Sequence, residues 1–157
     1  VLVGHSDGGS IALIHAGGAG REVAGLILMA PHVFVEDLSI ASIAQAKVAF
    51  ETTDLGQKLG KYHRDPVKTF RGWNDIWLHP DFRAWNIEEV LPHVTCPVSV
   101  IQGEDDEYGT PAQVEAIRRQ AKGEVEVLML ADCRHSPHKD QPQATLEAMA
   151  GFIERIG

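Results

Sequence analysis

The 157-residue sequence predicts an α/β fold, in which helices cover a doubly wound, mostly parallel sheet. Four short apolar runs are typical of strands buried on both faces, and helical patterns follow three of them. The second and third runs are joined by a segment far longer than the connections usual in such folds. We therefore expect a sheet-and-helix core with one large helical insertion.

Strands are predicted over residues 1–4, 25–29, 98–102 and 125–130. Each run is apolar, and most are rich in Leu or β-branched residues, which favour strands. Because helical segments separate most of these runs, crossover connections are expected and the strands should run parallel.

Helices are predicted between and after these strands. One spans residues 8–16 and another residues 111–122, and each ends at glycine. A last helix is expected after Asp140, whose side chain would form a capping box with Gln143, three residues further on.

The chain is thus expected to consist of a core, residues 1–30 and 97–157, and an inserted unit, residues 31–96. Within the insertion, the apolar spacing predicts a helix over residues 40–59. Asp65, followed by proline, is the expected start of another helix.

The insertion is rich in aromatic residues. These side chains could line a lid over an apolar pocket, which would make Trp73 and Trp77 substrate contacts, or they could form the core of the inserted helices. Both interpretations stay open from the sequence. Seven of the ten aromatic residues fall in this stretch: Phe50, Tyr62, Phe70, Trp73, Trp77, Phe82 and Trp85.

Composition excludes several classes of protein. A formal net charge of −8 would repel a phosphate backbone, so no nucleic-acid partner is expected. No apolar run approaches the length of about eighteen residues that a spanning helix requires, so no membrane role is expected. Cys96 and Cys133 make no disulfide framework, which favours a reducing compartment and a cytoplasmic location.

The sharpest motif is Gly4-His5-Ser6-Asp7-Gly8, a G-x-S-x-G pattern between a predicted strand and a predicted helix. A turn from strand to helix within one residue forces the serine into positive-φ geometry, and small residues at both glycines would let the two elements approach. Ser6 would then project at the carboxyl edge of the sheet, where open α/β sheets bind ligands. The position of His5 tolerates many residue types, so no role is assigned to it.

A serine hydroxyl is a weak nucleophile at neutral pH and needs a base and an orienting acid. Candidates follow the last two predicted strands, at the same sheet edge as Ser6: an acidic loop that contains Asp106 and a loop that contains His135. Asp105 and Glu107 are rival acids in the first loop, and His138 is a rival base in the second. A zinc site built on Cys133 and these histidines lacks a fourth ligand, so neither a metal nor a cofactor is expected.

Three stretches together resemble the α/β-hydrolase fold superfamily: GHSDGG, IQGEDDEYGTP and CRHSPHKDQP. The resemblance covers essentially the whole chain and implies Ser6 as nucleophile, Asp106 as acid and His135 as base. It also implies that the backbone N–H of Asp7 helps to bind the oxyanion, with a second donor from a loop after the family's third strand. The family usually has glycine before the catalytic histidine, whereas this chain has Arg134.

The resemblance further implies that the insertion is a helical cap and that the four strands correspond to strands 5–8 of the family's sheet. On this interpretation the chain is the C-terminal half of a larger domain, and the strand at residues 1–4 has one unpaired edge. His32 and Phe34, directly after the second strand, are candidate substrate contacts; a hinge between core and insertion is their alternative role.

These observations predict a serine hydrolase that transfers an acyl group to water. A small or medium-sized apolar carboxylic ester is the expected substrate. Thioester hydrolysis, carbon–carbon bond hydrolysis and a non-catalytic ligand-binding relative are the alternatives. The oligomeric state is not predicted.

Overall fold

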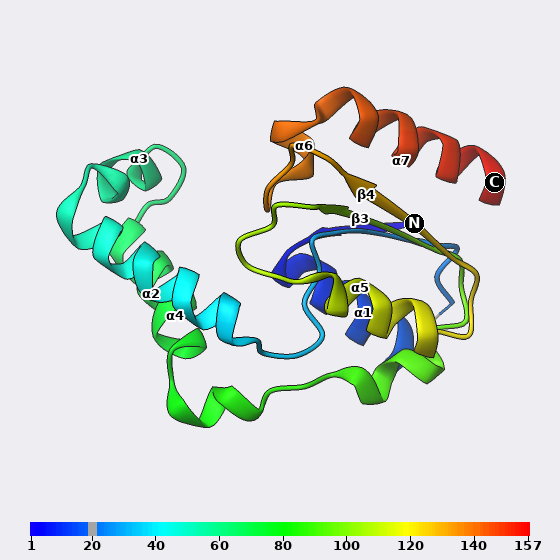
Figure 1. The fold of residues 1–157 in the computed structure, drawn as a ribbon, viewed down its shortest axis with the longest axis horizontal. Helices are drawn as coiled ribbons and strands as arrows, with labels where there is room; N and C mark the ends of the chain where they lie inside the picture. The colour runs from blue at the N-terminus through cyan, green and yellow to red at the C-terminus, as the bar shows by residue number, and fades with distance from the viewer. Residues whose placement is uncertain (19–21) are drawn as a thin grey trace. The chain divides into compact units, whose positions relative to one another are not determined.

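The computed structural model describes residues 1–18 and 22–157 and divides into two compact units (Figure 1). The first consists of Val1–Phe34 and Asn86–Gly157, and the second is Val35–Trp85. Part of the predicted insertion therefore belongs to the first unit. In that part, the Ile87 N–H donates to the Val33 carbonyl at 2.8 Å, and Leu91 is fully buried.

The first unit contains one parallel sheet in the order β1-β2-β3-β4, as expected for an α/β fold. The strands are β1 (Leu2–His5), β2 (Leu26–Met29), β3 (Val98–Gly103) and β4 (Val125–Leu130), which differ from the predicted strands by no more than one residue at either end. Among the described residues, β1 pairs with β2 alone and lies at an edge of the sheet.

Helices lie on both faces of this sheet. Figure 1 shows α1 (Asp7–Gly18) and α5 (Pro111–Gln120) on one face and α7 (Pro142–Ile156) on the other. Two short elements complete the unit, the 3-10 helix η2 (Glu88–His93) and α6 (Pro137–Asp140).

The predicted capping box at Asp140 and Gln143 is wrong. The cap residue of α7 is Gln141, which makes no side-chain cap hydrogen bond, and Pro142 occupies the first turn, where a missing N–H costs nothing. Asp140 ends α6, and its Oδ2 instead accepts the backbone N–H of Arg134 at 2.9 Å.

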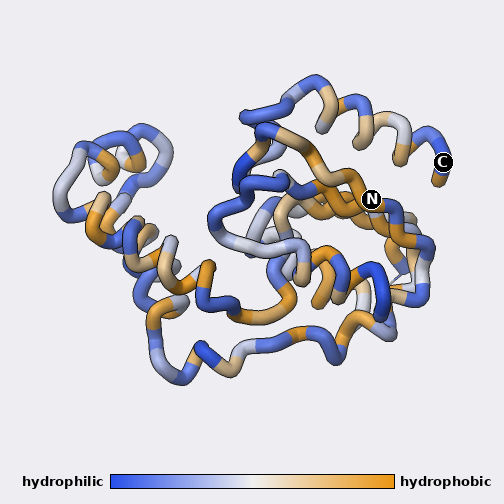
Figure 2. The backbone as a smooth tube through the Cα atoms, in the orientation of Figure 1, coloured by the Kyte–Doolittle hydropathy of each residue, from blue (hydrophilic) through white to orange (hydrophobic). Residues whose placement is uncertain are grey.

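The core of the first unit is the middle of the sheet. All residues of β2 and β3 are buried, whereas Val3 of the edge strand is 51% exposed. Figure 2 shows the strands as the most continuous hydrophobic part of the backbone. Phe152 of α7 packs against a buried cluster that includes Ile27, Ile101 and Leu130. A well-packed sheet of this kind holds the loops at its carboxyl edge in fixed positions.

The second unit is helical: α2 (Asp37–Thr52), α3 (Leu55–Gly60), α4 (Pro66–Trp77) and the 3-10 helix η1 (Pro80–Ala84). The single helix predicted over residues 40–59 is wrong, because Thr53 adopts an extended backbone that separates α2 from α3. The predicted start of α4 is confirmed, since the Asp65 side chain accepts the Lys68 N–H at 2.9 Å.

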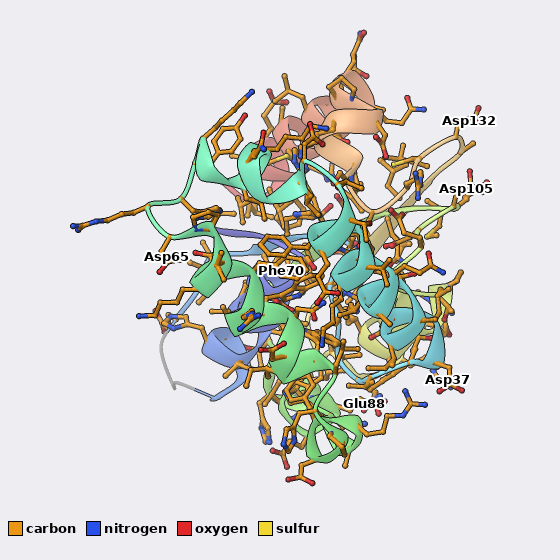
Figure 3. The ribbon with its side chains drawn as sticks, turned by 90° about the vertical axis from the view of Figure 1, so that its left-hand side faces the viewer. Asp37, Asp65, Phe70, Glu88, Asp105 and Asp132 are labelled. Carbon is orange, nitrogen blue, oxygen red and sulfur yellow. The ribbon has the colours of Figure 1, made fainter. Side chains whose placement is uncertain are left out.

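Aromatic contacts form the interior of the second unit. Phe70 lies between α2 and α4 (Figure 3) and stacks on Phe50, with ring centroids 4.0 Å apart. The ring of Trp77, which is 5% exposed, packs against Phe82 and Trp85. These rings therefore serve as a core within this unit. In residues 1–18 and 22–157, no helix is both long and apolar enough to cross a membrane.

Candidate active site

Ser6 occupies the turn between β1 and α1. Its φ is 55°, in the left-handed region that non-glycine residues rarely adopt. The turn is held by hydrogen bonds, since the Ser6 N–H donates to the Met29 carbonyl at 2.9 Å and the Gly9 N–H donates to the Ser6 carbonyl at 2.8 Å. Strained backbone that its surroundings fix in this way is typical of functional sites.

Close approach at this turn requires Gly4 rather than Gly8. A Cβ on Gly4 would overlap the Gly8 carbonyl, and a Cβ on Gly9 would lie 3.0 Å from the Pro31 Cβ. A Cβ on Gly8 would meet nothing within 4 Å. The expectation that Gly8 itself needs a minimal side chain is therefore wrong. The Gly8 backbone instead lies so close to Gly4 that Gly4 has no room for a side chain.

Asp106 lies in the loop after β3 and is 8% exposed. Its Oδ1 accepts the backbone N–H groups of Tyr108 at 2.8 Å and Gly109 at 3.3 Å, which fixes the carboxylate. Gly103 brings this loop against the loop after β4, because a Cβ there would overlap the Cys133 carbonyl.

The structure brings Ser6, Asp106 and His135 together. His135 Nδ1 lies 2.8 Å from Asp106 Oδ1, and His135 Nε2 lies 3.0 Å from Ser6 Oγ. With Nδ1 protonated and donating to the carboxylate, Nε2 is free to accept the serine proton, which is the tautomer that a general base needs. This geometry fits nucleophilic catalysis by serine.

The rival residues occupy different places. Asp105 is exposed, and Figure 3 shows it at one edge of the molecule near Asp132. The Glu107 carboxylate accepts the His135 N–H at 3.1 Å and pairs with Arg134 at 3.1 Å. His138 is exposed, and its ring packs against His5.

Three rings surround the His135 imidazole. The ring centroids of His5, His32 and Tyr108 lie 5.1, 5.7 and 4.7 Å from that of His135. Burial lowers the pKa of His5, and this outweighs the hydrogen bond with the His135 backbone, which raises it. Burial, with the negative charge of Glu107, raises the pKa of Tyr108, which keeps the phenol protonated.

The remaining predicted residues lie in both units. Asp7 is the first residue of α1, and the partial positive charge of a helix N-terminus favours a developing negative charge. His32 is buried beside His135 in the first unit, whereas Trp73 and Trp77 lie on α4 of the second. Phe34 ends the first segment of its unit, and its backbone bonds to the side chain of Gln113. The roles of these residues in binding stay predictions.

Comparison with known proteins identifies a family that shares this sequence pattern. The model of the alpha/beta hydrolase family matches residues 1–148. The chain belongs to the alpha/beta hydrolase family. No curated protein sequence matches it significantly.

Solved structures share the fold of this alpha/beta hydrolase. The chain superposes on a bacterial membrane phospholipase A with a TM-score of 0.70 and 19% identity, covering 98% of this chain and 56% of that one. It superposes on CarC, a serine hydrolase of carbazole degradation, with a TM-score of 0.72 and 17% identity. The match covers 97% of this chain and 62% of CarC. It superposes on an esterase from Thermogutta terrifontis with a TM-score of 0.63 and 18% identity. The match covers 98% of this chain and 64% of the esterase. The chain thus spans a little over half to nearly two thirds of these proteins.

The sequence did not predict two further residues with positive φ, nor the contact of Glu107 with His135, in this alpha/beta hydrolase. Ala30 and Asp132 have φ values of 46° and 51°, and like Ser6 they come within two residues of a strand's end. Among the described non-glycine residues, these three have positive φ. Their position after a strand was the available signal. No sequence signal predicted the contact of Glu107 with His135, since it joins residues of two loops that are 28 positions apart.

Proposed function

We propose that this alpha/beta hydrolase is a serine hydrolase that cleaves a carboxylic ester by acyl transfer to water. Ser6 is the nucleophile, His135 the general base and Asp106 the residue that orients it. The observation that carries this proposal is the continuous hydrogen-bonded series from Ser6 Oγ through His135 to Asp106, with separations of 3.0 and 2.8 Å.

In the first half-reaction, His135 Nε2 takes the hydroxyl proton while Ser6 Oγ attacks the ester carbonyl carbon. Asp106 stabilises the resulting imidazolium through Nδ1–H. The tetrahedral intermediate collapses, the C–O bond to the alcohol breaks, and His135 returns its proton to the leaving alkoxide.

In the second half-reaction, His135 deprotonates a water molecule that attacks the acyl-serine. The carboxylic acid leaves, and Ser6 recovers its proton. During both steps the backbone N–H of Asp7, at the start of α1, donates to the oxyanion.

The substrate that best fits this proposal is a small or medium-sized apolar acyl compound. Rings beside His135, those of His32 and Tyr108, would contact it, and Phe34 of the same unit is a further contact candidate. An esterase and a phospholipase A are among the structural neighbours, which is consistent with an ester substrate.

The test is hydrolysis of short p-nitrophenyl esters by the wild type and by Ser6→Ala. The wild type should release p-nitrophenol, and Ser6→Ala should reduce kcat by about 10⁴-fold or more with an unchanged melting temperature. Ser136→Ala is the matched control, because it removes a hydroxyl next to His135 that makes no cap hydrogen bond. Equal rates in the wild type and Ser6→Ala would reject the proposal.

A further inference from the structure

The backbone of His135 is held by a side chain on each side of its α-carbon. The His135 N–H donates to Glu107 Oε2 at 3.1 Å. The His135 carbonyl accepts from His5 Nε2 at 2.7 Å. Because a carbonyl can only accept, His5 must carry its proton on Nε2 to make this bond.

The two holding residues come from the loops that carry the other site residues. His5 directly precedes Ser6, and Glu107 directly follows Asp106. The His5 contact therefore joins the loop of His135 to the segment that carries Ser6. The Glu107 contact joins it to the segment that carries Asp106. If the segment of Ser6 or Asp106 shifts, the bonded His135 backbone is expected to shift with it. The distances from the imidazole to Ser6 and Asp106 are then preserved.

Glu107 is itself fixed by an ion pair. Its Oε1 lies 3.1 Å from Arg134 Nη2, and its side chain is 32% exposed. The Arg134 backbone N–H donates to Asp140 Oδ2 at 2.9 Å, which ties the residue before the base to the end of α6. Arg134 thus supplies a charged contact that glycine at this position would lack.

The imidazole must satisfy two partners at once, with 2.8 Å to Asp106 and 3.0 Å to Ser6. Rotation about the side-chain bonds alone cannot correct a shift of the α-carbon at both ends of the ring. A misplacement of about 1 Å can reduce a catalysed rate by about 100-fold. The backbone contacts therefore control the reactive geometry.

We infer that Glu107 and His5 are positioning residues, which hold the backbone of His135 so that its ring spans Ser6 and Asp106. The inference rests on the proposed function for its kinetic consequences, but the geometry it describes has a readout of its own. The Nδ1 proton of a histidine bonded to a carboxylate gives a far-downfield proton resonance, whose loss in Asp106→Asn assigns it.

The variants separate hydrogen bonding from charge and from folding. Glu107→Ala removes the acceptor, whereas Glu107→Gln keeps an acceptor oxygen without the charge. His5→Ala removes the donor, whereas His5→Gln places an amide N–H near the position of Nε2. Glu104→Gln, an exposed residue of the same loop, is the matched control.

We expect Glu107→Ala and His5→Ala to lower kcat for a p-nitrophenyl ester by about 10- to 100-fold, with KM changed less than about twofold. The Gln variants should recover most of kcat, and Glu104→Gln should match the wild type. The downfield resonance should broaden or shift in both Ala variants and return in the Gln variants.

Wild-type kcat in both Ala variants, or a downfield resonance that neither Ala variant changes, would overturn the inference. A loss of kcat that Gln fails to rescue at either position would also overturn it, because hydrogen bonding would then not be the cause. If the wild type hydrolyses no ester, the proposed function fails, while the resonance still decides whether Glu107 and His5 position His135.

Discussion

His135 Nε2 lies 3.0 Å from Ser6 Oγ, although 129 positions separate the two residues in the sequence. The contact forms because β1 and β4 are parallel strands of one sheet and both residues follow a strand at its carboxyl edge. His5 strengthens the link, since it precedes Ser6 and donates to the His135 carbonyl at 2.7 Å.

The assignment of the base predicts different outcomes at two nearby histidines. His135→Gln should lower kcat by about 10⁴- to 10⁶-fold, because His135 Nε2, 3.0 Å from Ser6 Oγ, is the group placed to take the serine proton. His138→Gln should leave kcat within about threefold of the wild type, since that exposed ring packs on His5 rather than on Ser6. Steady-state kinetics on a p-nitrophenyl ester measures both. A large loss in His138→Gln with activity retained in His135→Gln would reverse the assignment.

The assignment of the acid is tested by amide substitution within one loop. Asp106→Asn keeps the side-chain shape but favours the wrong His135 tautomer, and kcat should fall by about 10⁴-fold. Asp105→Asn removes an equal charge from an exposed neighbour and should change kcat little. Comparable losses in the two variants would mean that the net charge of the loop, not orientation by Asp106, supports the reaction.

Two glycines of the motif should respond oppositely to alanine. Gly4→Ala forces a Cβ into the Gly8 carbonyl, and the free energy of unfolding should fall by about 3 kcal/mol or more. Gly8→Ala meets nothing within 4 Å and adds helix propensity in α1, so stability should hold or rise by about 0.5–1 kcal/mol. Urea denaturation measures both. Equal destabilisation would show that the turn is not packed as described.

Acid should destabilise the fold partly through His5. Burial lowers its pKa below the ordinary value of 6.5, so between the folded and unfolded pKa the unfolded chain binds more protons. The stability that neutral His5 contributes is therefore complete above about pH 6.5 and is lost as pH falls through the folded pKa. Groups that share its surroundings are His135, His138 and Asp106.

The matched variant for this effect is His5→Gln, which does not titrate. The free energy of unfolding of the wild type should fall more steeply than that of His5→Gln as pH is lowered from about 8 to about 5. Urea unfolding at each pH gives both curves. Parallel curves would contradict a lowered pKa for His5.

The fold class, the parallel sheet and the start of α4 could be predicted from sequence, because apolar runs, helical spacing and Asp-Pro are local signals. Ser6 stands in a local motif between a strand and a helix, whereas only the family resemblance separates Asp106 and His135 from the rival residues in their loops. The break between α2 and α3 was missed, because the apolar spacing continues across Thr53 while its backbone is extended.

Other features depend on contacts between distant loops. In the sequence, Glu107 is one of several acidic residues of a turn. In the structure its carboxylate accepts the backbone N–H of His135, 28 positions away. His5 had no distinguishing neighbours in the sequence, and its bond to the His135 carbonyl spans 130 positions. The capping box at Asp140 is wrong because α7 begins at Pro142 with Gln141 as its cap residue, while Asp140 ends α6.

The central claim is that Ser6 is a nucleophile activated by His135. Its most direct test is labelling with a fluorophosphonate, followed by peptide mapping of the adduct by mass spectrometry. The account predicts one adduct, on Ser6, which is absent in Ser6→Ala and forms far more slowly in His135→Gln. An adduct on another residue, or labelling of Ser6 at an unchanged rate in His135→Gln, would contradict it.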